Sequence, residues 1–404
     1  MARPPLTGIK VYEIGNFMAA PYCTMQLADL GADVVKIENP KGGDMTRQTA
    51  PFLDGESSNF IRLNRNKRSL ALDLKSAEGK EIFRSLARGA DIIVENLRPG
   101  TMADLELDYA RLAAANPRLI YVAASGWGQD GPYAEYPGLD IIAQGMSGLM
   151  SITGHAGDDP VKVGVPITDL VCALYGALAA VSALHAREQS GRGQLIDVCL
   201  FEAGVSLAIW EAGKYFATGE IPKPLGSAHQ TSAPYQALRS ADGYFTAGAS
   251  TARNWSNFCT TLGLGQLEHD PRFAENHLRR EHLAALTPLI EAVTTTHPSD
   301  YWVERLQAAG VPAGKLQNYE QVFHDPHLAA RGYLTDAPHA TLGAIRQLGS
   351  PMRFSETKVR IERAGPLLGE HSREILEALG YTGAQIDQLI ARGIIAKPEV
   401  PTVR

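Results

Sequence analysis

The chain has 404 residues, of which 45% are apolar and 20% charged, so it resembles a soluble globular protein of two or three domains. A net charge of −6 excludes a generally basic surface for nucleic acid. The four cysteines form no C-x-x-C pair and indicate neither a zinc site nor a disulfide framework: Cys23, Cys172, Cys199 and Cys259. We expect buried free thiols in a cytoplasmic protein.

No segment has the pattern of a secretory signal or a membrane span. Residues 1–5 lack the apolar core of a signal peptide. The apolar stretch at 170–184 is shorter than the roughly 18 residues that a span requires, and we interpret it as a buried helix. We therefore expect no membrane partner.

The first half of the chain has an α/β pattern. Strands at 9–14 and 32–38 flank a helix at 19–30, a unit typical of a parallel sheet. Further strands are expected at 69–73, 90–95, 119–124 and 194–198. The helices between and after them are expected at 78–87, 109–115, 140–149, 167–189 and 200–217.

The composition changes near residues 219–235, where prolines and glycines indicate a loop and a domain boundary. A smaller α+β unit is expected to follow, with helices at 254–262, 279–295 and 298–309. After Gly332 we expect short strands and two final helices, at 371–379 and 383–392.

Local motifs alone leave the function open. The segment 126–131 fits G-x-G-x-x-G, but Pro132 follows at once and the context of a dinucleotide site is poor. The histidines show no metal-ligand spacing, so no metal is expected. A basic cluster could hold phosphates or could be a solvated loop: Arg62, Arg65, Lys67, Arg68 and Lys75. Asp169 opens an apolar helix, which by itself is typical of a helix cap.

Seven ordered segments together resemble the class III coenzyme A transferases, of the formyl-CoA transferase and carnitine CoA-transferase type. They are residues 27–38, residues 64–75 around Asn66-Lys67-Arg68-Ser69, residues 94–100, Gly138-Leu139-Asp140 with Gln144, Thr168-Asp169, residues 191–194 and residues 367–371. The resemblance extends over residues 5–396.

This resemblance implies a discontinuous architecture. A large Rossmann-like domain that binds coenzyme A would comprise residues 1–220 and 330–404, and a small α+β domain residues 228–320. Residues 221–227 and 321–329 would be linkers. Two chains would form a homodimer of interlocked rings.

The resemblance also implies a chemistry. Asp169 would be the nucleophile, and coenzyme A would pass from an acyl-CoA donor, such as succinyl-CoA, to a small free carboxylic acid through aspartyl-anhydride and aspartyl-CoA intermediates. Acyl-CoA is then a substrate, and no tightly bound cofactor is needed. Asp140 matches an acidic position beside the nucleophile, with helix capping as its alternative role. The expected coenzyme A contacts are Leu72, Lys75, Asn96, Leu97 and Arg98.

The sequence departs from the formyl-CoA transferases around the expected acid site. Met18 stands in place of a glutamine, and Asn39 and Asp104 stand in place of basic residues. Residues 226–231 lack the glycine-rich lid and look more like members that use succinate and other dicarboxylates. We expect Met18 to lie at the substrate site. His229 would either contact the acceptor or be an ordinary loop residue.

Two other functions remain possible on the same fold. An α-methylacyl-CoA racemase needs a proton-transferring histidine immediately before the position of Asp140, but Leu139 is there. A non-catalytic acyl-CoA-binding protein would not require the acid at Asp169.

Overall fold

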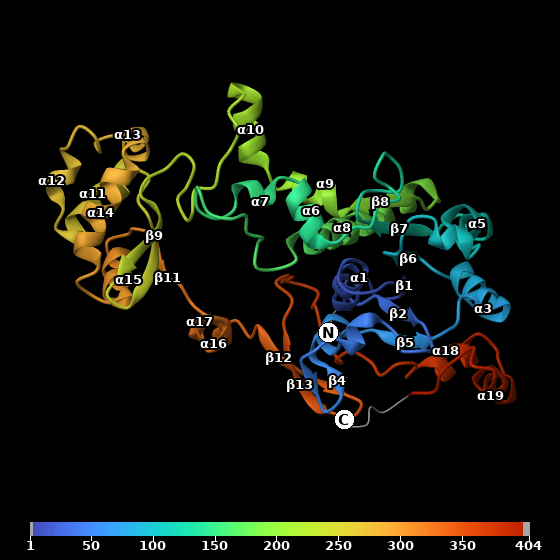
Figure 1. The fold of residues 1–404 in the computed structure, drawn as a ribbon. Coiled ribbons are helices and arrows are strands. Elements are labelled where there is room, and N and C mark those ends of the chain that lie inside the picture. The colour runs from blue at the N-terminus through green and yellow to red at the C-terminus, as the bar shows by residue number, and fades with distance from the viewer. Residues whose placement is uncertain (1–2, 399–404) are drawn as a thin grey trace. The chain divides into compact units, whose positions relative to one another are not determined.

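The computed structural model describes residues 3–398, and the chain divides into two compact units. The large unit contains the chain up to Leu149, Lys162–Ala212 and the chain from His327 on. The small unit contains Met150–Val161 and Gly213–Pro326. The chain therefore leaves the large unit twice, briefly after Leu149 and again after Ala212, and it returns for the last time at His327 (Figure 1).

A six-stranded parallel sheet forms the centre of the large unit, in agreement with the α/β prediction. Most of its strand residues are buried, because helices cover both faces of the sheet. The strands, in spatial order, are β5 (Arg68–Ala71), β2 (Asp33–Glu38), β1 (Lys10–Ile14), β6 (Ile92–Glu95), β7 (Ile120–Ser125) and β8 (Leu195–Cys199).

The strand order reverses direction between β1 and β6. From β1 the chain builds outward through β2 to β5, then returns to the other side of β1 and builds outward through β6, β7 and β8. In open parallel sheets, ligands bind outside the carboxyl ends of the strands at such a switch point.

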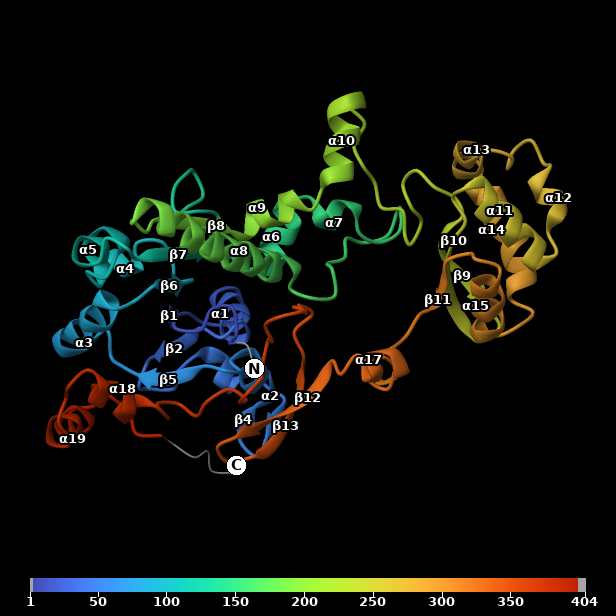
Figure 2. The same cartoon turned by 180° about the vertical axis from the view of Figure 1, so that it is seen from behind.

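Two groups of helices cover the sheet (Figures 1 and 2). On one face, α1 (Ala19–Asp29) and α8 (Ile167–Ser190) pack against Val11, Val94 and Val122. The opposite face packs against Tyr12, Ile93 and Tyr121. Its helices are α3 (Ala77–Arg88), α5 (Tyr109–Ala115), α18 (Ser372–Ala378) and α19 (Gly383–Ala391).

Helix α8 contains the apolar stretch that we interpreted as a buried helix, but only one of its faces is covered. Among residues 3–398 it is the one helix whose length and hydropathy would allow it to span a bilayer, and 44% of its apolar window is buried inside the chain. Core helices of soluble proteins can have the same length and hydropathy. The absence of a membrane partner therefore stays a prediction. Leu174 and Leu178 remain 47% and 63% exposed on its other side.

Some expected helices are shorter or divided. The helix expected at 140–149 ends earlier, because Gly148 adopts a left-handed φ of 88° between α6 (Asp140–Met146) and α7 (Leu149–Ile152). The helix expected at 200–217 is two, α9 (Leu200–Ser206) and α10 (Ile209–Thr218). Tight i→i−3 bonds from the N–H groups of Leu207 and Ala208 end α9.

The small unit packs helices against a three-stranded antiparallel sheet. The sheet has the order β11 (Ala313–Lys315), β10 (Gly243–Gly248), β9 (Tyr235–Ser240). Trp255 and Phe258 lie in its core, and the buried Arg279 guanidinium lies over the Trp255 ring. The helices are α11 (Ala252–Leu262), α12 (Gly265–Glu268), α13 (Asn276–Glu281), α14 (Leu283–Thr294), α15 (Ser299–Ala308) and α16 (Tyr319–Phe323).

The end of the chain completes the large unit. The backbone N–H of Gly369 donates to Ser69 Oγ at 2.9 Å, and Arg47 donates to the Pro366 carbonyl at 3.1 Å. Short elements make up the rest of this region and the loops: η1 (Met45–Gln48), β3 (Phe52–Leu53), β4 (Glu56–Ser57), α2 (Ser58–Leu63), α4 (Thr101–Asp104), α17 (Pro326–Ala330), β12 (Leu334–His339) and β13 (Gly343–Leu348).

Candidate active site

Two of the segments that we expected to contact substrate meet at the switch point of the sheet. The loop Gly15–Met18 follows β1, and Asn96–Arg98 follows β6. The Asn96 side chain accepts from the Asn16 N–H at 3.0 Å and donates to the Asn16 carbonyl at 2.9 Å. Both hydrogen bonds hold the two carboxyl-end loops together, so the Asn96 amide is occupied within the chain.

The other two residues after β6 differ in their surroundings. Leu97 is half-buried, and its N–H donates to Glu95 Oε2 at 2.7 Å. Burial raises the pKa of Glu95 to about 7 although it accepts this bond. Arg98 is exposed and donates to the Glu135 carbonyl at 3.2 Å, so part of its guanidinium faces solvent, where a phosphate could bind.

The two expected coenzyme A contacts after β5 differ in exposure. Leu72 is 1% exposed, packs in the core and donates its N–H to the Glu38 carbonyl, so its side chain is not open to a ligand. Lys75 is exposed just before α3, and its backbone N–H bonds to Asp73.

Two members of the basic cluster of residues 62–75 are buried and paired within the chain, whereas Lys75 is exposed. Arg65 is buried against Asp29, with 2.6 Å between Nη2 and Oδ2. Lys67 is buried against Glu13, with 2.7 Å between Nζ and Oε2. These cations are neutralised by carboxylates of the chain itself, which spacing along the sequence did not reveal.

Asp169 lies in the first turn of α8, which begins at Ile167 without a side-chain cap from Pro166. Because α8 connects back to the parallel strand β8, its N-terminus lies at the carboxyl edge of the sheet. The starts of three helices converge there, since Ala19 of α1, Ala143 of α6 and Cys172 of α8 pack in one cluster. Asp169 therefore lies at the same edge as the loop that contains Met18.

Asp140 caps a helix, but not its own. Its Oδ1 accepts from the N–H of Thr168 at 3.0 Å and from the Thr168 hydroxyl at 2.7 Å. Its Oδ2 accepts from Gln144 at 2.7 Å, and Gln144 in turn accepts from the Val163 N–H at 2.9 Å. The carboxylate thus fixes the start of α8 immediately before Asp169.

A close backbone contact explains the position of Asp140. A Cβ on Gly126 would lie 2.7 Å from the Gly138 Cα, and one on Gly138 would lie 2.6 Å from the Gly126 Cα. Only glycine at both positions allows the end of β7 to approach the chain just before α6. The G-x-G-x-x-G look-alike begins at this contact.

The Asp169 carboxyl group has a high proton affinity. Burial and the Asp140 carboxylate raise its pKa to about 7. A carboxylate that is poorly solvated is a stronger nucleophile than one in water, and such shifted groups concentrate at functional sites.

His229 belongs to the small unit and is held locally. Its Nδ1 accepts from the Thr231 N–H at 3.2 Å, and its ring contacts Tyr235 with 4.9 Å between centroids. A role in acceptor binding stays a prediction. Within residues 3–398, no three His, Cys, Asp or Glu side chains gather as metal ligands.

Comparison with known proteins decides the family. The model of CoA-transferase family III matches residues 6–372. The chain belongs to this family. A succinate–glutarate CoA-transferase of Agrobacterium fabrum is 37% identical over 93% of this chain and 96% of its own length. The human succinyl-CoA:glutarate CoA-transferase is 34% identical over 98% of this chain and 91% of its own. A crystal structure of a CAIB/BAIF family protein from Brucella suis is 38% identical, with a TM-score of 0.85 over 94% of this chain and all of that one.

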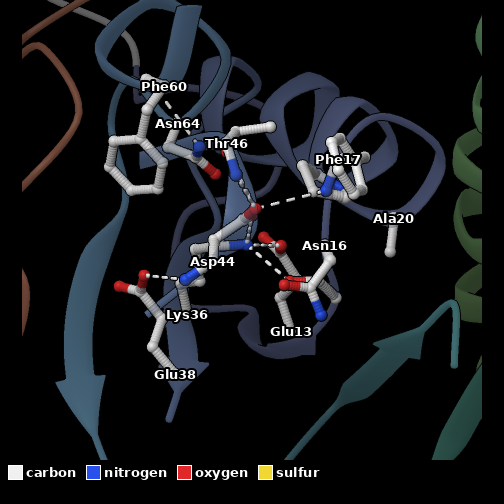
Figure 3. A network of polar contacts seen from close by, with 12 residues as sticks. Glu13, Asn16, Phe17, Ala20, Lys36, Glu38, Asp44, Thr46, Phe60 and Asn64 are labelled. Carbon is white, nitrogen blue, oxygen red and sulfur yellow. Dashed lines mark hydrogen bonds and ion pairs between the residues drawn. The ribbon is translucent and has the colours of Figure 1, made fainter. Parts of the chain in front are cut away.

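This family III transferase also contains buried charges that our sequence reading missed (Figure 3). Glu13, Lys36 and Lys67 have no exposed surface. The sequence did contain a signal, because Glu13 and Lys36 are charged residues inside apolar strands. The pairing of β1 with β2 places them directly opposite each other.

Proposed function

We propose that this enzyme transfers coenzyme A from succinyl-CoA to a second carboxylic acid, and that the acceptor is a small dicarboxylic acid. The proposal rests chiefly on one observation: a carboxyl group of raised pKa, Asp169, lies at the carboxyl edge of a sheet in a family III transferase. The relatives named for glutarate support a dicarboxylate acceptor. Their names also support succinyl-CoA as the donor.

The first half of the reaction loads the enzyme. An Asp169 oxygen attacks the thioester carbon of succinyl-CoA, the C–S bond breaks, and coenzyme A leaves as a thiolate. The thiolate then attacks the aspartyl carbonyl of the mixed anhydride. Succinate leaves as a carboxylate, and an aspartyl-CoA thioester remains.

The second half repeats these steps with the acceptor. The acceptor carboxylate attacks the aspartyl-CoA carbonyl and expels the thiolate, which gives a new mixed anhydride. The thiolate attacks the acceptor's acyl carbon, and Asp169 leaves as a carboxylate. Each nucleophile is an anion, so no base has to remove a proton during the cycle.

The chain's own residues have assigned parts in this proposal. Asp140 fixes the first turn of α8 and so the direction of Asp169. Arg98 and Lys75 are exposed cations suited to the phosphates of coenzyme A. Asn96 holds the Met18 loop against its own segment. Leu72 would contribute only as support beneath that surface.

We also propose that the active form is a homodimer, with interlocked rings as the resemblance implies. The outer face of α8 supports this, since Leu174, Leu178 and Val181 are apolar and exposed. Helix α10 supports it too, because none of its residues is buried and Phe216 is 82% exposed. The four free, buried thiols are consistent with the cytoplasm as its location.

The test is transfer itself. The enzyme is incubated with succinyl-CoA and single acids, including glutarate, and new CoA thioesters are measured by mass. Hydroxylamine added during turnover should convert Asp169 to a hydroxamate that peptide mass spectrometry locates. Transfer that survives intact in Asp169→Asn, with no hydroxamate in the wild type, would refute the covalent route.

A control separates a racemase from a transferase. A racemase exchanges the proton next to the thioester carbon with deuterium from solvent when no acceptor is present. Leu139, the residue before Asp140, is 63% exposed and offers no group that transfers protons. We expect no exchange on a chiral 2-methylacyl-CoA.

A further inference from the structure

Six charged side chains form a neutral cluster beneath the loop Gly15–Met18. The buried charge cluster, as we call it, has three acids and three bases: Glu13, Glu38, Asp44, Lys36, Arg47 and Lys67. Lys36 joins Glu13 at 2.5 Å and Asp44 at 2.8 Å, and all three side chains are 0% exposed. A buried ion pair is weak evidence for stability, because desolvation offsets much of the attraction. Stability alone therefore does not explain why these charges lie beneath this loop.

The cluster acts directly on the backbone of the loop (Figure 3). Lys36 donates to the Gly15 carbonyl at 2.9 Å. Asp44 Oδ1 accepts from the Phe17 N–H at 3.2 Å, and is itself held by the N–H and hydroxyl of Thr46, both at 2.8 Å. Next to it, Asn16 Oδ1 accepts from the Met45 N–H at 3.2 Å.

Phe17 needs this support because its backbone is strained. Its φ is +58°, a left-handed value that residues with a Cβ adopt rarely. Phe17 is 48% exposed, so packing of its side chain does little to hold the residue in place. Strained backbone of this kind persists where surrounding structure fixes it, often at ligand sites. The Asp44 carboxylate is the group that accepts from the strained residue.

The loop is attached to the proposed site at both ends. Asn96, at the carboxyl end of β6, bonds to both peptide groups of Asn16. Met18 is the residue before α1, whose first residue, Ala19, packs with Cys172 one turn after Asp169. A shift of the loop would therefore disturb both the Asn96 contact and the packing of α1 against the start of α8.

We propose that the buried charge cluster positions the loop Asn16–Met18 for acyl-CoA, with Asp44 holding Phe17 in its left-handed conformation and Lys36 joining Asp44 to Glu13. This inference rests on the proposed function, because it assigns the loop to the acyl-CoA site. Lys36, Asp44 and Glu13 are positioning residues and do not touch the substrate.

The first test separates positioning from stability. Asp44→Asn removes the charge that faces Lys36, and we expect KM for succinyl-CoA to rise about tenfold while KM for glutarate changes less than twofold. Asp29→Asn is the matched control, because Asp29 forms an equally buried pair with Arg65 away from the loop. It should lower the unfolding temperature comparably and leave both KM values unchanged.

The second test examines the strain itself. Phe17→Gly and Phe17→Ala both remove the ring, but only alanine keeps the penalty for positive φ. With Asp44 present the two variants should have similar KM values, because the loop is held in either case. In the Asp44→Ala background, which lacks the acceptor for the N–H of residue 17, the glycine variant should have a KM for succinyl-CoA about three- to tenfold lower than the alanine variant.

A third variant covers the case in which Asp44→Asn does not fold. Asn16→Ala leaves every buried charge in place and removes the acceptor for the Met45 N–H. It should also raise KM for succinyl-CoA and weaken coenzyme A binding in titration calorimetry. The proposal is overturned if Asn16→Ala binds coenzyme A as the wild type does, or if Asp44→Asn and Asp29→Asn change KM equally. Wild-type enzyme without any transfer would instead refute the proposed function.

Discussion

Asp140 Oδ1 accepts two hydrogen bonds from Thr168, one from its N–H at 3.0 Å and one from its hydroxyl at 2.7 Å. The two residues lie 28 positions apart, on the first turns of α6 and α8. One carboxylate therefore supplies the missing cap of α8 and places a negative charge beside Asp169. The cap stabilises the first turn of α8, which carries Asp169. The charge raises the pKa of Asp169 and so lowers the ionised fraction of this carboxyl group at neutral pH.

The first prediction concerns the pH dependence of transfer. Because the pKa of Asp169 is raised to about 7, a large share of the enzyme carries a protonated, non-nucleophilic carboxyl group at neutral pH. We expect kcat/KM for succinyl-CoA to increase with pH and level off above an apparent pKa near 7. A profile that is flat between pH 5 and 8 would contradict the ionised Asp169 as nucleophile.

The second prediction separates the charge of Asp140 from its capping role. Asp140→Asn removes the charge and keeps an oxygen that can accept from Thr168, so the apparent pKa in the pH–rate profile should move below that of the wild type. Asp140→Ala also removes the cap, and should cost about 1 kcal/mol of unfolding free energy in addition. Rate profiles and urea denaturation of both variants measure the two effects. Identical profiles for Asp140→Asn and wild type would exclude the electrostatic effect.

The third prediction concerns the stability cost of the nucleophile. The carboxyl of an unfolded chain ionises near pH 4, whereas folded Asp169 ionises near pH 7, so the ionised form is disfavoured by folding. The cost grows from pH 4 to pH 7 and is complete above pH 7, where the rise of the pKa from near 4 to about 7 corresponds to roughly 4 kcal/mol. Asp169→Asn should therefore be more stable than wild type at pH 8 and gain much less at pH 4.5. Thermal unfolding at both pH values checks the sign.

The fourth prediction tests the close contact beneath the Met18 loop. A Cβ on Gly15 would lie 2.7 Å from the Ala20 Cβ and 2.8 Å from Asn96 Oδ1. Gly15→Ala should therefore displace Asn96 from Asn16, raise KM for succinyl-CoA several-fold and cost about 1–3 kcal/mol. Gly265→Ala is the control, since its Cβ would meet nothing within 4 Å and should leave KM unchanged.

The fifth prediction concerns the exposed face of α8. Leu178 is 63% exposed in the single chain, so Leu178→Asp should fold and should shift the enzyme toward monomer if a second copy covers this face. Light scattering after size-exclusion chromatography measures the mass in solution. Arg88→Asp, at an exposed position on α3, should not alter it. A wild type that is already monomeric would refute the homodimer.

The parallel sheet and its helices could be read from the sequence because apolar periodicity is a local signal. Residues 9–14, 19–30 and 32–38 agree closely with β1, α1 and β2. Helix ends were less certain, since the end of α6 depends on the positive φ of Gly148. The resemblance to the transferases depended on the order of seven segments, and the family match over residues 6–372 confirms it.

The site itself was less accessible to sequence reading. Asp140 acts on Thr168, and Lys67 on Glu13, across distances along the chain that only the folded structure closes. The burial of Arg65 and Lys67 was hidden for the same reason, because their partners Asp29 and Glu13 lie on α1 and β1. A role of His229 in acceptor binding stays a prediction, because no local pattern of the sequence connects it to Asp169.

The large unit needs both its N-terminal and its C-terminal segments, and this requirement determines when the unit can form during synthesis. Glu38 accepts from Ser69, Ser69 accepts from the N–H of Gly369, and Arg47 bonds to the carbonyl of Pro366. A ribosome therefore makes more than 300 residues after Glu38 before its last partners leave the exit tunnel. Until then the nascent chain presents an incomplete sheet, and we expect chains that stop before residue 366 to be degraded rather than to accumulate as a shortened enzyme.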